Sequence, residues 1–411
     1  GDRLFQDMIQ YWSLFRDNST GLWCDWVGFG SAPGCGEENQ RYSSASVAVG
    51  LVSDCVLVEL GLLPRVEAEA RTLQTLIEVR TWPREAFHGF LVHFTDRNRS
   101  ATSEYSTIDT ALLVAGALFA GNFFGGEILN ASRDLLRLTD WSQALANATD
   151  PTIFTMVDPL SGKMHGILKP FNEYYIVAYL AMLQHPSPDS KASRYFNLFF
   201  GTSQKPEGAG GYPIHKEYHG YDLLTDHNGW VSSFIPQFCW FLTQSFQLDT
   251  YYSATLFPAW LRADMKFWET ALTNSSEVWG HPVKGKVWGC GAGTTPDGYR
   301  ADKIEDNPTL TFSSAIMAGF LGAAGDLQGT ILSQLQHMYD SRICAYHREL
   351  PWTSVWVLWR CSVKHSGWRA QGATCIDFST EVLGYATRYL RQGFFAEFAV
   401  GPDDAEADIV V

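Results

Sequence analysis

The sequence lacks several features by which whole classes of protein are recognised. Charged residues make up only 18% of the 411 residues, and the formal net charge is −14. No basic patch is present, so a phosphate backbone has nothing to bind and we expect no nucleic-acid partner. No uninterrupted apolar run reaches the roughly eighteen residues that a membrane-spanning helix needs. We therefore expect neither a membrane span nor a membrane partner.

The motifs of several enzyme classes are also missing. The sequence has no CxxC pair, which argues against a structural zinc site. GxSxG, HExxH, a Walker loop and a dinucleotide fingerprint do not occur in a suitable context. The DDxxD and DxDD clusters that a helical terpene cyclase would need are absent as well. We expect no metal and no cofactor.

Apolar and aromatic residues are abundant. Apolar residues make up 46% of the chain and aromatic residues 14%, including 15 Trp and 17 Tyr. This composition suits a large core. The aromatic excess also suits a surface that stacks on sugar rings.

Two features indicate a secreted protein. Asn-x-Ser/Thr acceptor sites occur at Asn18, Asn98, Asn130, Asn147 and Asn274. The eight cysteines are an even number, which is compatible with disulfides in an oxidising compartment. Cys24 and Cys35 flank a Gly/Pro-rich loop that a disulfide could close, whereas Cys55 and Cys239 lie in apolar runs and are predicted to be buried free thiols.

Hydrophobic periodicity predicts about twelve helices and few strands. The predicted spans are 2–17, 43–62, 64–82, 106–122, 125–144, 171–184, 188–200, 230–247, 250–273, 310–323, 325–341 and 376–392. Every second span, such as IDTALLVAGALFAG, is apolar nearly all round, as buried helices are. The spans between them, such as LPRVEAEARTLQTLIEVR, carry charges on one face and should contact water.

Six buried helices that alternate with six exposed ones predict an all-α (α/α)6 barrel, in which an outer ring surrounds an inner ring. No low-complexity linker divides the chain, so we predict one catalytic domain over 1–395, an acidic tail over 396–411 and a monomer. The connections into the inner helices are long and those out of them are short. The long loops therefore surround the inner N-termini, where we expect the functional site.

Acids at these helix starts are the candidate catalytic residues. Glu173 follows Asn172 and precedes two tyrosines on an otherwise apolar helix, so partial burial would raise its pKa as a general acid requires. Asp109 and Asp377 begin other inner helices. Two carboxyl groups across one site are what glycosidic bond cleavage needs. Simpler interpretations exist, because Asp109 could complete a capping box with Ser106 and Glu173 could complement the helix dipole.

A second set of residues is predicted to bind substrate. It consists of Glu104, Tyr174, His227, Trp230, Trp288, Tyr299, Arg300 and Asp306. The aromatic members are candidate platforms for sugar rings, and the polar members could bind hydroxyl groups. His227 could instead be a satisfied core histidine, and tryptophans in helices are more often core residues.

Three segments resemble a known family. STIDTALLVAGALFAG, FNEYYIVAYLAML and VWGCGAGTTPDGYRADKIEDNPTLTFSSAIMAGF are similar to the glucoamylase-like domain family and its related endo-β-1,2-glucanases. The matching segments keep the family's order and cover most of residues 100–395. The acceptor sites and cysteines make the secreted fungal branch the nearer comparison. Members of this family are (α/α)6 barrels, which agrees with the helix pattern.

The resemblance implies hydrolysis of linear β-1,2-glucan to sophorose-type oligosaccharides, with inversion at the anomeric carbon. It places the family's general acid at Glu173 and its supporting or substrate-holding aspartate at Asp109. It places the base side at Asp377. The sequence departs from the family around this last position, because Ile-Asp-Phe-Ser-Thr stands where many relatives have Ile-Asp-Gln-Gly-Pro. A YDAF-type segment is also not recognisable, and ELPWTSVWVLW stands in its place.

Two alternatives stay open at this stage. One is a hydrolase or transglycosylase of another β-glucan, because fold and helix motifs would survive a change of linkage. The other is a glycan-binding barrel that has lost its base, which the altered segment before Asp377 suggests.

Overall fold

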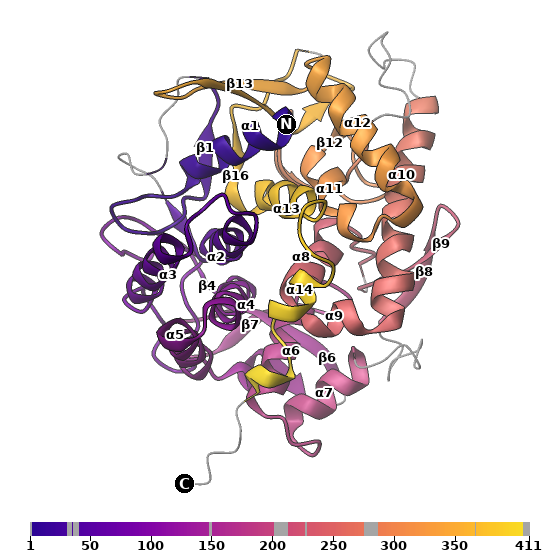
Figure 1. Cartoon of the computed structure of the whole chain (residues 1–411). Coiled ribbons are helices and arrows are strands. Elements are labelled where there is room, and N and C mark those ends of the chain that lie inside the picture. Colours follow the sequence, from indigo (N-terminus) through magenta and orange to yellow (C-terminus); the bar gives the residue numbers. More distant parts are fainter. Residues whose placement is uncertain are drawn as a thin grey trace.

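Twelve helices form two concentric rings, an (α/α)6 barrel (Figure 1). The computed structural model describes residues 2–30, 35, 41–147, 150–200, 213–226, 228–274, 287–365 and 367–405. The inner ring consists of α2 (Ser44–Glu59), α4 (Thr107–Phe124), α6 (Tyr175–Gln184), α8 (Phe234–Leu242), α11 (Ser314–Gly319) and α13 (Cys375–Ala386). The outer ring consists of α1 (Arg3–Trp12), α3 (Arg65–Val79), α5 (Gly126–Arg137), α7 (Lys191–Phe199), α10 (Phe257–Asn274) and α12 (Gln328–Asp340). The predicted fold and the alternation of buried and exposed helices are confirmed.

The inner helices pack at backbone distance because small residues face each other. In α4, fifteen of the eighteen residues are buried. A Cβ atom on Gly116 of α4 would lie 2.4 Å from the carbonyl oxygen of Ala48 in α2. Glycine is therefore required where these two helices meet.

One described helix, α4, is long and apolar enough by composition to cross a membrane. In the structure, 83% of its residues are buried inside the protein. It is surrounded by α2, α5 and α6 and is a core helix of the barrel.

Short antiparallel strands tie the long loops together at one end of the barrel. Four strands lead directly into inner helices: β2 (Tyr42–Ser43), β4 (Tyr105–Ser106), β12 (Thr311–Phe312) and β16 (Gly372–Thr374). Their partners come from other loops: β3 (Phe94–Thr95), β6 (Asp150–Val157), β15 (Cys361–Ser362) and β1 (Trp26–Gly28), respectively. Each long loop in these pairs is thus held against the start of an inner helix.

The remaining strands form hairpins within the loops. β5 (Leu145–Asn147) and β7 (Met164–Leu168) flank β6. The other pairs are β8 (Ile214–Tyr218) with β9 (Tyr221–Thr225), β10 (Ala292–Thr295) with β11 (Gly298–Ala301), and β13 (Ala345–Glu349) with β14 (Ser354–Leu358). The prediction of few strands is wrong, since the described chain has sixteen. All of them except β6 have two to five residues, which is too short to give a clear period of two.

The chain end packs against the opposite end of the barrel. The short helix α14 (Phe394–Phe398) lies in front of the ring in Figure 1 and contacts α4 and α8. Val400 N donates to the carbonyl of Leu242 at 3.1 Å, and the amide of Asn122 donates to Asp404 at 3.1 Å. The predicted tail boundary is therefore wrong: residues 396–405 belong to the barrel, and only 406–411 lie outside the described part.

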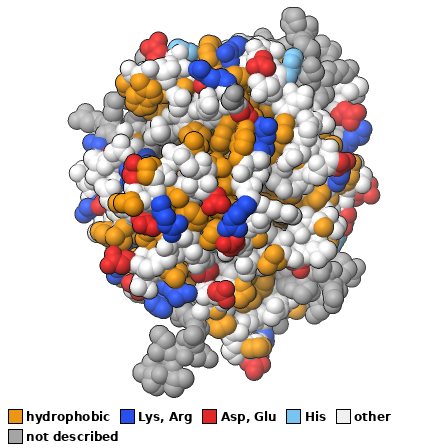
Figure 2. Space-filling view, in the orientation of Figure 1, with side chains coloured by type: hydrophobic (Ala, Val, Ile, Leu, Met, Phe, Trp, Pro, Cys, Tyr) orange, Lys and Arg blue, Asp and Glu red, His pale blue; other side chains and the backbone are white. Residues whose placement is uncertain are grey.

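Figure 2 shows hydrophobic side chains gathered in a hollow on this face. Two grooves lie at this end. One of about 420 Å³ is lined by Phe5, Ile9, Leu62 and Tyr389 among others, and one of about 240 Å³ lies beside Phe394. No lining residue of either groove is one of the predicted catalytic acids.

Two disulfides connect Cys24 with Cys35 and Cys344 with Cys361. The first is the pair that flanks the Gly/Pro-rich loop. Cys55 and Cys239 are buried free thiols, as predicted. Disulfides are typical of proteins outside the reducing cytosol.

The acceptor sites differ in how far the structure describes them. The side chains of Asn18, Asn98 and Asn130 are exposed. Those of Asn147 and Asn274 lie outside the described part of the chain. Glycosylation at all five stays a prediction.

Candidate active site

Asp109 begins the inner helix α4 and is held on both of its carboxylate oxygens. Ser106 caps the helix by accepting from the Asp109 backbone N–H, and its hydroxyl donates to Asp109 Oδ2 at 2.5 Å. Oδ1 lies 3.3 Å from Nε2 of His93, which comes from the loop between α3 and α4. Ser106 is therefore the cap, and it also fixes the carboxylate of Asp109 beside His93.

His93 joins two carboxylates. Its Nδ1 lies 2.8 Å from Glu104 Oε1, while Nε2 faces Asp109. Burial would lower the pKa of His93, but the charges of Asp109, Glu104 and Asp25 outweigh burial and raise it. The hydrogen bond from His93 lowers the pKa of Glu104. A cationic imidazole between carboxylates fits these directions.

Glu173 lies in the turn before α6, which begins at Tyr175 rather than at the predicted residue 171. The side chain keeps partial solvent contact, but its Oε2 atom is enclosed and has no hydrogen-bond partner among the described residues. Burial, together with the negative charges of Asp109 and Asp226, raises the pKa of Glu173 to about 7. A carboxyl group with this pKa can hold a proton near neutral pH.

Asp226 precedes α8 and faces the same space. Its Oδ1 accepts from the backbone N–H groups of Asn228 at 2.8 Å and Trp230 at 3.0 Å. The loop is thereby folded so that Asp226, 2% exposed, acts on the charge of Glu173. His227, which the sequence predicted to bind substrate, lies outside the described residues.

Asp377 lies in the first turn of α13. The hydroxyl of Thr374 donates to its Oδ2 at 2.7 Å, and the residue is only 7% exposed. Burial raises the pKa of Asp377 to about 6; the Thr374 hydrogen bond and Arg360 oppose this shift, and Asp25 adds to it.

Asp25 is a site residue that the sequence analysis missed. It follows Cys24 in the first long loop and interacts electrostatically with His93, Arg41 and Asp109. Burial raises its pKa. The search for acids considered helix starts, whereas Asp25 reaches the site from a loop. The signal that could have found it is an acid beside a disulfide cysteine in a long loop at the functional end.

A buried ion pair supports the hairpin before α11. Arg360 and Asp302, both 0% exposed, are joined at 2.7 Å. Arg360 also donates to the carbonyls of Gly291, Ala292 and Thr294 in and beside β10. Arg300 and Asp306, both predicted to bind substrate, pair with each other at 3.2 Å at the edge of this network.

Tyr299, on the β10–β11 hairpin, is 67% exposed. Partial burial and the charges of Asp377, Asp25 and Asp109 raise the pKa of its hydroxyl. Tyr299 therefore lies near these three acids while most of its ring is open to solvent. Trp230 is partly exposed, and the Lys303 ammonium lies 5.1 Å from its ring centroid.

Two residues that were predicted to bind substrate, Trp288 and Tyr174, are largely buried, and their role stays a prediction. Trp288 is 2% exposed and its indole N–H donates to Gln334 of the outer helix α12 at 3.1 Å, so it is a core residue. Tyr174 is 5% exposed, although Glu173, Asp109 and Glu104 all act on its hydroxyl.

His93, Glu104 and Asp109 also have donor atoms within 4.8 Å of one another, a spacing that could suit a metal ion. The two imidazole nitrogens face different carboxylates, so one ion cannot be coordinated by both nitrogens. The expectation of no metal stays a prediction.

No family model and no curated protein matches the chain. Solved structures do. A candidate glucoamylase from Bacteroides caccae superposes with a TM-score of 0.73 at 17% identity, over 98% of this chain and 96% of its own. The endo-β-1,2-glucanase from Chitinophaga pinensis, solved with sophorotriose and glucose, gives 0.73 at 15% identity over 96% and 93%. The β-1,2-glucanase from Parabacteroides distasonis gives 0.74 at 15% identity over 98% and 58%. These are the kinds of protein that the sequence motifs resemble, and the fold that this resemblance implied is confirmed.

Proposed function

We propose that this protein is a secreted glycoside hydrolase, an endo-β-1,2-glucanase that cleaves linear β-1,2-glucan with inversion. The observation that carries the proposal is the state of Glu173: its enclosed Oε2 atom and a pKa of about 7 fit a general acid. The fold shared with two β-1,2-glucanases supports the substrate class.

Glu173 would act first by giving its proton to the glycosidic oxygen that leaves. Its proton is retained because burial disfavours the ionised carboxylate and because Asp109 and Asp226 place negative charge beside it. Both carboxylate oxygens of Asp109 already have partners, the Ser106 hydroxyl and the His93 imidazole. We assign Asp109 to holding substrate and to keeping Glu173 protonated through its negative charge.

A carboxylate on the opposite side of the ring would activate water. The inner helices follow one another in the order α13, α2, α4, α6, α8 and α11, so α6 and α13 lie across the ring from each other (Figure 1). Glu173 precedes α6, and Asp377 begins α13. Inversion needs two carboxyl groups separated widely enough, about 6.5–9.5 Å, for a water molecule beside the sugar.

The remaining polar and aromatic groups at this end would bind the glucan. Tyr299 offers an exposed ring for stacking, and Trp230 offers a second. Glu104, with a side chain 41% exposed, and the Arg300–Asp306 pair can bind sugar hydroxyls.

The test is a product assay on linear β-1,2-glucan beside β-1,3-, β-1,4- and α-1,4-glucans. Wild type is compared with E173Q and with E127Q, a matched change at an exposed glutamate of the outer helix α5. We expect sophorose-series products from wild type and E127Q only. Activity on another glucan instead would overturn the proposed specificity for the β-1,2 linkage. Binding without turnover on every glucan would replace the enzyme by a glycan-binding barrel.

A further inference from the structure

Asp25 is fixed at the junction of two inner helices by its own backbone. Its N–H donates to the carbonyl of Arg41, just before α2, at 2.9 Å. Its carbonyl accepts from the N–H of Cys375, the first residue of α13, at 2.8 Å. The next residue, Trp26, begins the pairing of β1 with β16 opposite Thr374. Asp25 is therefore placed as firmly as the acids on the helices.

The side chain of Asp25 has an environment that differs from those of the other acids. It is half-buried, and no hydrogen bond reaches its carboxylate from the described residues. His93 and Arg41 act on it electrostatically, and its own charge acts on Asp377 and Tyr299. Asp109 acts electrostatically on both Asp25 and Glu173.

We propose that Asp25 is the general base of this site, facing Glu173 across the inner ring. The assignment rests on the proposed glycoside hydrolysis. Asp25 takes a proton from water as the water oxygen bonds to the anomeric carbon. The bond from that carbon to the glycosidic oxygen breaks with its electron pair on oxygen, and Glu173 supplies the proton there. Exchange with solvent then restores a protonated Glu173 and an ionised Asp25.

The two other acids are less suited to this step. Asp109 has both oxygens occupied by Ser106 and His93. Asp377 is 7% exposed and accepts from Thr374, so a water molecule beside a sugar has little access to it. A general base has to lie within hydrogen-bond reach of the attacking water, or at most one further water away. Asp25 combines partial exposure with an unoccupied carboxylate.

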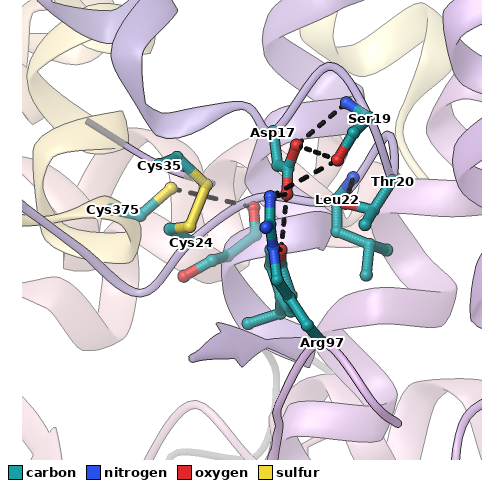
Figure 3. The surroundings of a disulfide bond; sticks show 10 residues. Asp17, Ser19, Thr20, Leu22, Cys24, Cys35, Arg97 and Cys375 are labelled. Atoms are coloured by element: carbon teal, nitrogen blue, oxygen red, sulfur yellow. Dashed lines mark hydrogen bonds and ion pairs between the residues drawn. A yellow bond between two sulfur atoms is a disulfide. The ribbon is translucent and has the colours of Figure 1, made fainter. Parts of the chain in front are cut away.

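The loop around Asp25 is built to hold this position. Cys24 forms the disulfide with Cys35, and both backbone N–H groups donate to the carbonyls of Phe15 and Leu14, at 2.8 and 3.0 Å. Figure 3 shows a second anchor, in which Asp17 accepts from Ser19 and Arg97 beside the disulfide. These contacts limit the movement of the segment that carries Asp25.

The experiment compares D25N and D377N with D189N, a control at an exposed aspartate between α6 and α7. Activity on linear β-1,2-glucan is measured with and without sodium azide, after thermal unfolding has shown that each variant folds. Azide is an anion that attacks without losing a proton, so it replaces a missing base. D25S serves as the second variant if D25N does not fold.

We expect D25N to lower kcat at least about 100-fold with KM changed less than about threefold. Azide should restore turnover in D25N and give a glycosyl azide of inverted configuration, which a structural defect would not do. Three results would overturn the assignment while leaving the proposed function in place. They are a near-normal kcat in D25N, a loss of kcat in D25N with no glycosyl azide formed, and formation of glycosyl azide by D377N instead of D25N. A wild type inactive on every glucan would overturn both.

Discussion

The Nε2 atom of His93 lies 3.3 Å from the Oδ1 atom of Asp109, so a loop residue and a helix start share one ion pair. We expect D109N to lower the pKa of His93, because the imidazolium loses an opposite charge. A raised histidine pKa stabilises the fold below the pKa of the unfolded chain, and this stability is lost as pH rises through the folded value. D109N should therefore lower the free energy of unfolding by about 1–2 kcal/mol more at low than at high pH. Histidine NMR titration and urea unfolding, with D189N as control, measure both effects.

The dependence of kcat/KM on pH should report the protonation of Glu173. Because burial raises its pKa to about 7, the proton needed by the leaving group is lost above that pH, and kcat/KM should fall on the alkaline side with a midpoint near this value. D226N removes a negative charge that raises this pKa, so the alkaline limb should move to lower pH. An unchanged limb in D226N, with wild-type stability, would contradict the assignment of the limb to Glu173.

Removing one partner of the buried Arg360–Asp302 pair should lower the stability of the protein. R360M leaves the Asp302 carboxylate without its buried partner, and we expect a loss of about 3–5 kcal/mol in the free energy of unfolding. The double variant R360M/D302N should recover part of this loss, because the uncompensated charge is gone. Urea unfolding of wild type, R360M, D302N and the double variant measures the coupling, and additive losses would show that the two residues act independently.

Two glycines in helices should respond to alanine in opposite directions. G116A places a Cβ 2.4 Å from the Ala48 carbonyl oxygen, so α2 and α4 must separate and the midpoint of thermal unfolding should fall. Nothing lies within 4 Å of a Cβ at Gly329 in α12. G329A should raise stability by about 0.4–1 kcal/mol through the unfolded chain. Similar midpoints for both variants would contradict the close packing of the inner ring.

Substitutions of Tyr299 and Trp288 should have different effects, because one ring is exposed and the other lies in the core. Y299A removes a ring that is 67% exposed, so stability should stay the same while KM for glucan rises about tenfold. W288A removes a ring that is 2% exposed, and we expect a loss of about 3–5 kcal/mol in stability. Calorimetry and steady-state kinetics on both variants test this division. A stability loss in Y299A would show that its ring packs against the protein.

The sequence alone determined the rings. A helix such as α4 that is apolar all round has to be buried, and a helix such as α3 with one charged face has to meet water. These are local properties of the side chains, so periodicity reveals them. Glu173 and Asp109 could be singled out as candidates, because one lies just before and the other in the first turn of a largely apolar helix, where a polar group is unusual.

Only the tertiary structure decided which other groups surround these acids. Asp25, His93 and Arg360 reach the site from loops far apart in the chain, and the short strands that hold those loops pair with distant partners. The same holds for Trp288, which sequence placed at the site and packing placed in the core. Burial and charge, and therefore the pKa of each acid, depend on neighbours that are remote in sequence, and folding alone brings them together.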